Sequence, residues 1–270
     1  MDLSYLALPI FQRALLAGSI VAALLALLGV LVTARGLAFL GDGLSHAAFG
    51  GIALGMFLGA SSPLLVAIPF TALAAVAIGA LRRKGLRSDV AMAAIFAVCF
   101  ALGVILLRKA RRTQGTFDPE ALLFGNILLV GEDDLYVVLG IAVVTVVLMV
   151  ATWTRVAYAT FDEELARLSG IEVGWLESAL LGLLAAVVVA AIRLAGVVLV
   201  SAFLVIPAAA GRIVGRSLGG VVGWAMTAGV VGVLLGFVVA HALEWPEGAA
   251  IVIVLAFLLS LSVAVKRLRR

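Results

Sequence analysis

The sequence has few of the residues on which soluble enzymes and secreted domains depend. Charged residues make up 13% of the 270 residues, about half the share found in an ordinary soluble domain. Cys99 is the single cysteine and lies in an apolar run, so the chain has no internal disulfide and the thiol is expected to be a small packing residue. The two histidines are His46 and His241. They form no His-Glu-x-x-His sequence, which excludes a metalloprotease of that type.

Apolar runs are what the sequence has in abundance. Hydrophobic residues make up 65% of the chain, and the mean hydropathy is +1.28. Runs of about 20 apolar residues, the length a helix needs to cross a bilayer, recur from end to end. No hydrophilic block is long enough for a separate soluble domain, and the alternation of a membrane barrel is absent. We therefore predict an all-α fold, a polytopic transmembrane helical bundle forming one domain over residues 1–270.

The positions of these runs predict nine membrane spans, with eight as the alternative. The first run lacks the cleavage sequence of a signal peptide and is kept as a span. The count depends on the run 196–214, because Pro207 interrupts it and only residues 193–196 separate it from the span before. The predicted spans are 14–34, 38–59, 62–81, 89–107, 134–153, 174–194, 196–214, 219–242 and 248–265.

Short basic clusters predict the orientation of the bundle. The nine-span path places the clusters 82–88, 212–216 and 266–270 on one side, which the positive-inside tendency makes cytoplasmic. The same path leaves the N-terminus and the cluster 108–112 outside, the latter against that tendency. The apolar stretch 119–131 is too short to cross and is expected to be a re-entrant or interfacial helix. Because the clusters at span ends account for the net charge of +4, nucleic-acid binding is excluded.

The most polar segment of the chain, 154–175, is expected to form a short amphipathic helix on the cytoplasmic face. Phe161, Leu165 and Leu168 would lie on one side of that helix. Acidic residues at its start suit the helix dipole, and Gly170 is a natural stop. The alternative is an ordinary connecting loop.

Asp42 and His46 are ionisable residues within an otherwise apolar run, "FLGDGLSHAAFGGIALG". Residues four apart share one face of a helix. Ionisable groups are costly in a membrane and usually mark a substrate path or a proton relay. Carboxylate and imidazole are ligands for zinc, manganese and iron, and one of each makes half of a four-ligand site. A two-fold dimer would complete the set. The alternative is a polar pair satisfied within the chain, with Asp42 capping a helix or pairing with an arginine and His46 bonding a carbonyl.

A second group of candidate ligands lies at the predicted outer end of a span. His241 is followed by Glu244 and Glu247, and the group is a candidate outer gate. The alternative is an ordinary boundary histidine, because Pro246 breaks the helix there.

Three classes of membrane protein could have these features. An intramembrane aspartyl protease needs two carboxylates in one site, and no second aspartate lies in mid-span. A gradient-driven secondary transporter of a divalent cation is an alternative, although such proteins often contain repeats and none is evident here. A primary transporter would need its ATPase on another chain, because no G-x-x-x-x-G-K-[ST] sequence occurs.

Six motifs, in order, resemble the membrane permease family of bacterial ABC importers for zinc, manganese and iron. The resemblance covers most of the chain, from Phe39 to about Val254. The motifs are "FLGDGLSHAAFGGIALG", "SDVAMAAIFAVCFALGVILL", "LLFGNIL", "FDEELARLSGI", "GVVLVSAFLVIPAAAGR" and "PEGAAIVIV".

The resemblance implies a permease that is not itself an enzyme and binds no permanent cofactor. It implies a homodimer in the inner (plasma) membrane, two cytoplasmic ATP-binding-cassette ATPase subunits, an extracytoplasmic metal-binding protein, and a transported divalent metal. Asp42 and His46 would be metal ligands at the dimer axis, and 205–207 would belong to a broken helix near the path. The residues implied to couple to the ATPase are Phe161, Asp162, Glu163, Glu164, Leu165, Ala166, Arg167, Leu168, Ser169 and Gly170. One departure is Gly50, where the family often has proline.

Overall fold

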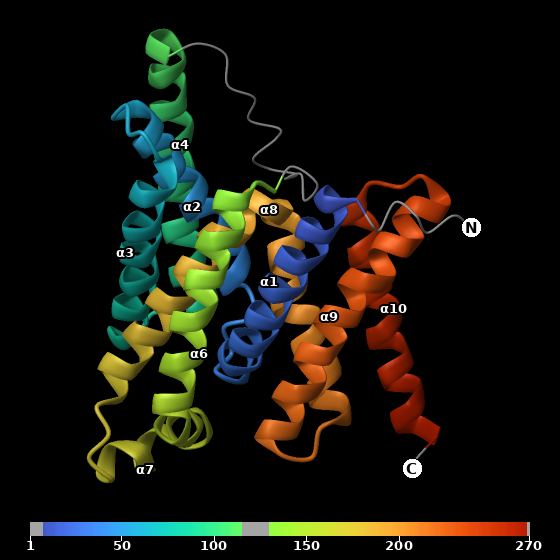
Figure 1. Cartoon of the computed structure of the whole chain (residues 1–270). Coiled ribbons are helices and arrows are strands. Elements are labelled where there is room, and N and C mark those ends of the chain that lie inside the picture. Colours follow the sequence, from blue (N-terminus) through green and yellow to red (C-terminus); the bar gives the residue numbers. More distant parts are fainter. Residues whose placement is uncertain (1–7, 115–129, 269–270) are drawn as a thin grey trace.

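The computed structural model describes residues 8–114 and 130–268, and within those ranges the chain is helical without strands (Figure 1). This confirms the predicted all-α bundle. The predicted interfacial helix at 119–131 and the motif "LLFGNIL" fall almost wholly outside the described residues. The helices are α1 Pro9–Ala34, α2 Leu40–Phe57, α3 Pro63–Arg83, α4 Ser88–Gln114, α6 Glu132–Phe161, α7 Glu163–Leu168, α8 Val173–Val214, α9 Leu218–Leu243 and α10 Glu247–Leu268.

Eight segments of the described chain are long and apolar enough to cross a membrane. They are α1, α3, the Ser88–Ala110 part of α4, α6, α9, α10 and the two parts of α8, Val173–Ile192 and Leu194–Val214. The one predicted span without a counterpart among these eight is 38–59. It corresponds to α2, which has 18 residues. Asp42, Ser45 and His46 lower its hydropathy. Most of α2 is nevertheless buried among the other helices.

Gly196, rather than Pro207, breaks α8. Its φ of 72° and ψ of 170° are not helical, and a positive φ of this size is accessible mainly to glycine. Pro207 lies inside the second part of the helix without a break, so the predicted interruption at Pro207 was wrong. Proline is tolerated inside membrane helices where neighbouring helices and local adjustments satisfy the freed backbone groups.

One face of the bundle collects the predicted cytoplasmic segments. We call it the basic face; it consists of the turns 35–39, 84–87 and 215–217, of α7, and of the end of α10 (Figure 1). The start of α1 lies at the opposite face, where Arg13 pairs with Glu132 at the start of α6. The end of α4 lies there too (Figure 1). This arrangement agrees with the nine-span path, including the position of the cluster 108–112 opposite to the other basic clusters.

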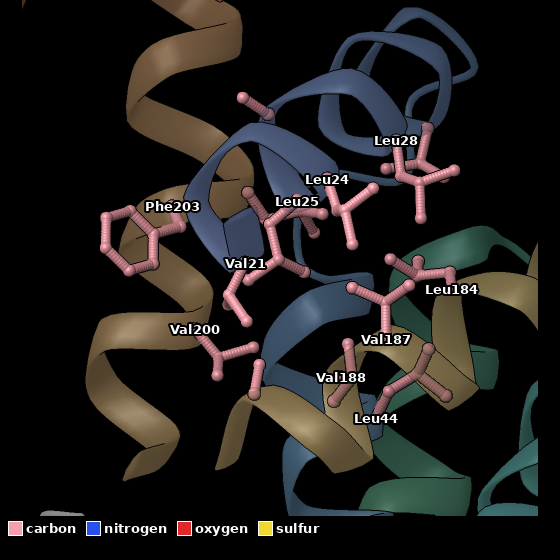
Figure 2. Close-up of a cluster of buried hydrophobic side chains, with 14 of the residues drawn as sticks. Val21, Leu24, Leu25, Leu28, Leu44, Leu184, Val187, Val188, Val200 and Phe203 are labelled. Carbon is pink, nitrogen blue, oxygen red and sulfur yellow. The ribbon is translucent and has the colours of Figure 1, made fainter. Parts of the chain in front are cut away.

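The core lies between α1, α2 and the two parts of α8. Figure 2 shows side chains of α1, among them Leu25 and Leu28, gathered with side chains of both parts of α8, which lie between them and Leu44 of α2. Leu25, Leu28 and Phe203 are fully buried. In a membrane such close packing, more than transfer from water, holds helices together. The core therefore fixes the start of α2, which carries Asp42 and His46, against the centre of the bundle.

Candidate metal site

Asp42 and His46 lie in the first two turns of α2 and point to the same side. His46 Nε2 is 3.8 Å from Asp42 Oδ1, which is too long for a hydrogen bond. Two atoms that each bind one zinc ion at about 2.0–2.2 Å can be up to about 4.2 Å apart. The pair is therefore spaced so that one ion could sit between the two atoms, as the spacing of four in the sequence predicts.

Aromatic side chains of α4 hold the His46 ring. Phe96 meets it edge-on with ring centroids 4.4 Å apart, and Phe100 does so at 5.5 Å. His46 Nδ1 is buried and has no hydrogen-bond partner among the described residues. The alternative in which His46 bonds a carbonyl is therefore not what the structure shows. The ring is positioned by packing.

Asp42 is more open than His46. Its side chain is 57% exposed, against 19% for His46. Ser201, in the second part of α8, donates a long hydrogen bond of 3.4 Å to Asp42 Oδ1. Among the described residues no arginine pairs with Asp42, and α2 has no side-chain cap. The two forms of the structural alternative, a helix cap and an arginine pair, are therefore both missing from the described residues.

A pocket of about 210 Å³ opens beside Asp42 between the starts of α2 and α4. Asp89, in the first turn of α4, lines it too and also pairs with Arg87 at 3.0 Å. Sequence reasoning missed Asp89, because an acidic residue at a helix start is ordinary. The other lining residues are Phe39, Gly43, Met92, Ala93 and Phe96.

No third candidate ligand is grouped with the pair in the described chain. In residues 8–114 and 130–268, no three His, Cys, Asp or Glu side chains are grouped so that they could hold an ion. That Asp42 and His46 supply half of a four-ligand set therefore stays a prediction.

The predicted amphipathic helix is present as α7. The Asp162 carboxylate caps it by accepting a hydrogen bond of 2.8 Å from the Leu165 backbone N–H. Gly170 ends the segment with a φ of 79°, which favours glycine. Ala166 faces the bundle and is fully buried. The helix is thereby fixed on the basic face of the bundle (Figure 1).

The opposite side of α7 is apolar and open. Phe161 is 74% exposed and Leu168 is 80% exposed, and Leu165 lies beside them at the surface. Arg167 pairs with Glu163 along the same short helix. Exposed apolar side chains rimmed by charged ones are typical of a protein–protein contact.

The candidate outer gate also comes together in space. His241, Glu244 and Glu247 line one pocket of about 350 Å³ at the face opposite α7, together with Phe11 and Trp245. Glu244 follows α9 with a φ of 56°, an uncommon conformation for a non-glycine residue. This residue lets the chain turn into α10, so the predicted helix break lies beside Pro246.

Comparisons with known proteins decide the family. The model of the ABC 3 transport family matches residues 7–266. The chain belongs to the ABC 3 transport family. This confirms the resemblance drawn from the six motifs.

Several members of the ABC 3 transport family are similar to the chain over nearly its whole length. The manganese transport system membrane protein MntC of Halalkalibacterium halodurans is 32% identical over 252 residues, which are 93% of this chain and 85% of that protein. The high-affinity zinc uptake system membrane protein ZnuB of Haemophilus influenzae is 31% identical over 92% of this chain and 95% of that protein. The structure of PsaBC from Streptococcus pneumoniae in complex with Fab matches with a TM-score of 0.85 at 29% identity, over 96% of this chain and 93% of that chain.

As a member of the ABC 3 transport family, the chain is a multi-pass membrane permease of an ABC transporter. It is the membrane subunit and not the ATPase, in keeping with the missing phosphate-binding sequence. The alternative of a gradient-driven secondary transporter is therefore set aside.

Proposed function

We propose that the chain imports a divalent transition metal, with Asp42 and His46 as the ligands on the translocation path. The observation that carries the proposal is the 3.8 Å separation of His46 Nε2 and Asp42 Oδ1, on a helix enclosed by others. Support for the substrate comes from relatives named for manganese transport and for zinc uptake. Iron stays with manganese and zinc in the proposal, because carboxylate and imidazole suit all three ions.

The proposed permease is a homodimer. Two copies of the pair, related by a two-fold axis, would present two nitrogens and two oxygens to one ion. The surface beside Asp42 supports this arrangement. Phe39 and Val198 are exposed apolar side chains, and Val198 lies three residues before Ser201, which contacts Asp42. A second copy would cover these side chains and bring its own pair to the axis.

Two further kinds of subunit belong to the proposed complex. Two cytoplasmic ATP-binding-cassette ATPases would bind the segment 161–170 through the open apolar side of α7. An extracytoplasmic metal-binding protein would deliver the ion at the opposite face, where His241 and Glu244 form the proposed outer gate. On this arrangement the basic face is cytoplasmic in the plasma membrane, as the positive-inside tendency requires.

Transport would proceed by alternating access without covalent chemistry in this chain. The ion would pass from the binding protein to the paired Asp42 and His46 and then toward the basic face. Conduction requires a site weak enough to release its ion, and the absence of a larger ligand group in the described chain fits that requirement. No permanently bound cofactor is needed for this cycle.

Reconstitution tests the proposal. The permease, its ATPase and its binding protein are placed in liposomes, and uptake of Mn²⁺, Zn²⁺ and Fe²⁺ is measured in parallel with and without ATP. The proposal predicts ATP-dependent uptake of at least one of these ions. Equal uptake without ATP, or no uptake of any of the three, would overturn it.

A further inference from the structure

Arg35 joins two parts of the basic face that are far apart in the sequence. Its Nε and Nη2 atoms donate hydrogen bonds of 3.2 and 3.1 Å to Thr160 Oγ1. Arg35 follows the last residue of α1, and Thr160 is the last residue but one of α6. Thr160 stands two residues before Asp162, which caps α7. The contact therefore ties the α1–α2 turn to the junction of α6 and α7.

The α1–α2 turn is short and well anchored. Gly36 has a φ of 73°, and Leu37 is buried with 1% of its surface exposed. The Leu37 backbone N–H donates to the Val32 carbonyl at 3.0 Å. α2 begins at Leu40 and carries Asp42 in its first turn. A displacement of Arg35 would therefore reach Asp42 through six residues that have little freedom to absorb it.

A second contact ties the other wall of the Asp42 pocket to the same region. Arg82 and Arg83, at the end of α3, both pair with Glu177 near the start of α8. The Arg82 Nε atom also donates to Ser88 Oγ at 3.0 Å. Ser88 is the first residue of α4, the helix that places Asp89 in the pocket. Glu177 is thus the link between the end of the α7 segment and the start of α4.

Nearby carboxylates favour the charged form of Arg35 against the cost of its burial. Burial lowers the pKa of the Arg35 guanidinium, and the carboxylates of Glu177 and Glu163 oppose that effect. The like charge of Arg82 lowers the pKa of Arg35 further. The Glu177 side chain is 13% exposed. Hydrogen bonds to a charged group are stronger than neutral ones, and limited access of water preserves that strength.

We infer that Arg35 and Glu177 are positioning residues that transmit movement of α7 to the two walls of the Asp42 pocket. The inference rests on the proposed function, in which an ATPase binds α7. When α7 moves, α6 and α8 move with it at its two ends. Thr160 then displaces the α1–α2 turn through Arg35, and Glu177 displaces the α3–α4 turn through Arg82 and Arg83. The pocket between the starts of α2 and α4 would widen or narrow as a result.

The chain offers a matched pair of threonines for the test. Thr160 and Thr152 both lie on α6, and each hydroxyl donates to the carbonyl four residues earlier at 2.6 Å. Only Thr160 also accepts from Arg35. The variants Thr160→Val and Thr152→Val therefore change the helix alike and differ in the contact with Arg35. Thr160→Ser keeps the hydroxyl and serves as the rescue variant.

The quantity to measure is Mn²⁺ taken up per ATP hydrolysed, with permease, ATPase and binding protein in liposomes. A merely structural role would lower uptake and hydrolysis together and leave this ratio unchanged. We expect Thr160→Val to lower the ratio by roughly tenfold, the effect of about 1.4 kcal/mol lost with a charged hydrogen bond. Thr152→Val and Thr160→Ser should keep the wild-type ratio.

Glu177→Gln provides an independent test, with Asp133→Asn as the control at an exposed position of α6 on the opposite face. Glu177→Gln should lower the ratio, and the exchange Glu177→Arg with Arg82→Glu should restore part of it. If the wild type shows no ATP-dependent uptake, the proposed function is wrong, and the inference that rests on it is wrong as well. If the wild type transports but Thr160→Val and Glu177→Gln match their controls, this inference alone is overturned.

Discussion

Gly50 of α2 lies directly against the Cys99 carbonyl of α4. A Cβ atom on Gly50 would be 2.6 Å from that oxygen, closer than atoms pack in proteins. The contact is one turn beyond His46 and joins the two helices that form the metal pocket. Glycine at this position is therefore required by the close approach of the two backbones.

Gly50→Ala should destabilise the permease, because the new methyl group forces α2 and α4 apart. Overpacking of this kind costs about 1–3 kcal/mol, and we expect a lower thermal unfolding midpoint in detergent. Gly43→Ala is the control on the same helix, since its Cβ would meet nothing closer than Met92 Cβ at 4.0 Å. Equal midpoints for the two variants would contradict the close contact.

Phe96→Leu should weaken metal transport through the orientation of His46. The substitution would remove the edge-on contact of the Phe96 and His46 rings, whose centroids are 4.4 Å apart. Leucine would keep position 96 apolar. Aromatic pairs contribute about 0.5–1.5 kcal/mol, so we expect the Mn²⁺ concentration for half-maximal uptake to rise by roughly threefold to tenfold. Phe257→Leu, at an exposed position of α10, should leave it unchanged. The same Mn²⁺ concentration for half-maximal uptake in both variants would show that packing against Phe96 does not orient His46.

Leu168→Glu should weaken binding of the ATPase, because it places a charge on the open apolar side of α7. Residues at the centre of an interface commonly contribute about 2 kcal/mol or more, which corresponds to at least tenfold in affinity. Binding of the purified ATPase to permease in nanodiscs measures the effect. Leu8→Glu is the matched control, because Leu8 is an exposed apolar residue before α1 on the opposite face. If the Leu168→Glu variant bound the ATPase as tightly as the wild type, α7 would not be part of the interface.

The helices and the metal pair follow from patterns within short stretches of sequence. Apolar length predicted the spans, and the spacing of four predicted that Asp42 and His46 share one face. Pro207 was misjudged because proline signals a break only where the surrounding chain has no better place to turn, and here Gly196 provides one.

Contacts between distant parts of the chain could not be predicted in the same way. Arg35 and Thr160 are 125 residues apart, and no local pattern relates them. Asp89 is inconspicuous in the sequence because its position at a helix start explains an acidic residue without a site. Its place beside Asp42 depends on how α2 and α4 pack, which the sequence of either helix alone does not specify.

The central claim is that Asp42 and His46 lie on the path of the ion. ATP-dependent Mn²⁺ uptake in liposomes should therefore be compared between the wild type and the double variant Asp42→Ala, His46→Ala, with Asp133→Asn as an exposed control on α6. We predict that the double variant still assembles with its ATPase but loses uptake by at least about tenfold, since ligand contacts of this kind exceed 1.4 kcal/mol. Uptake as fast as that of the wild type would contradict the account.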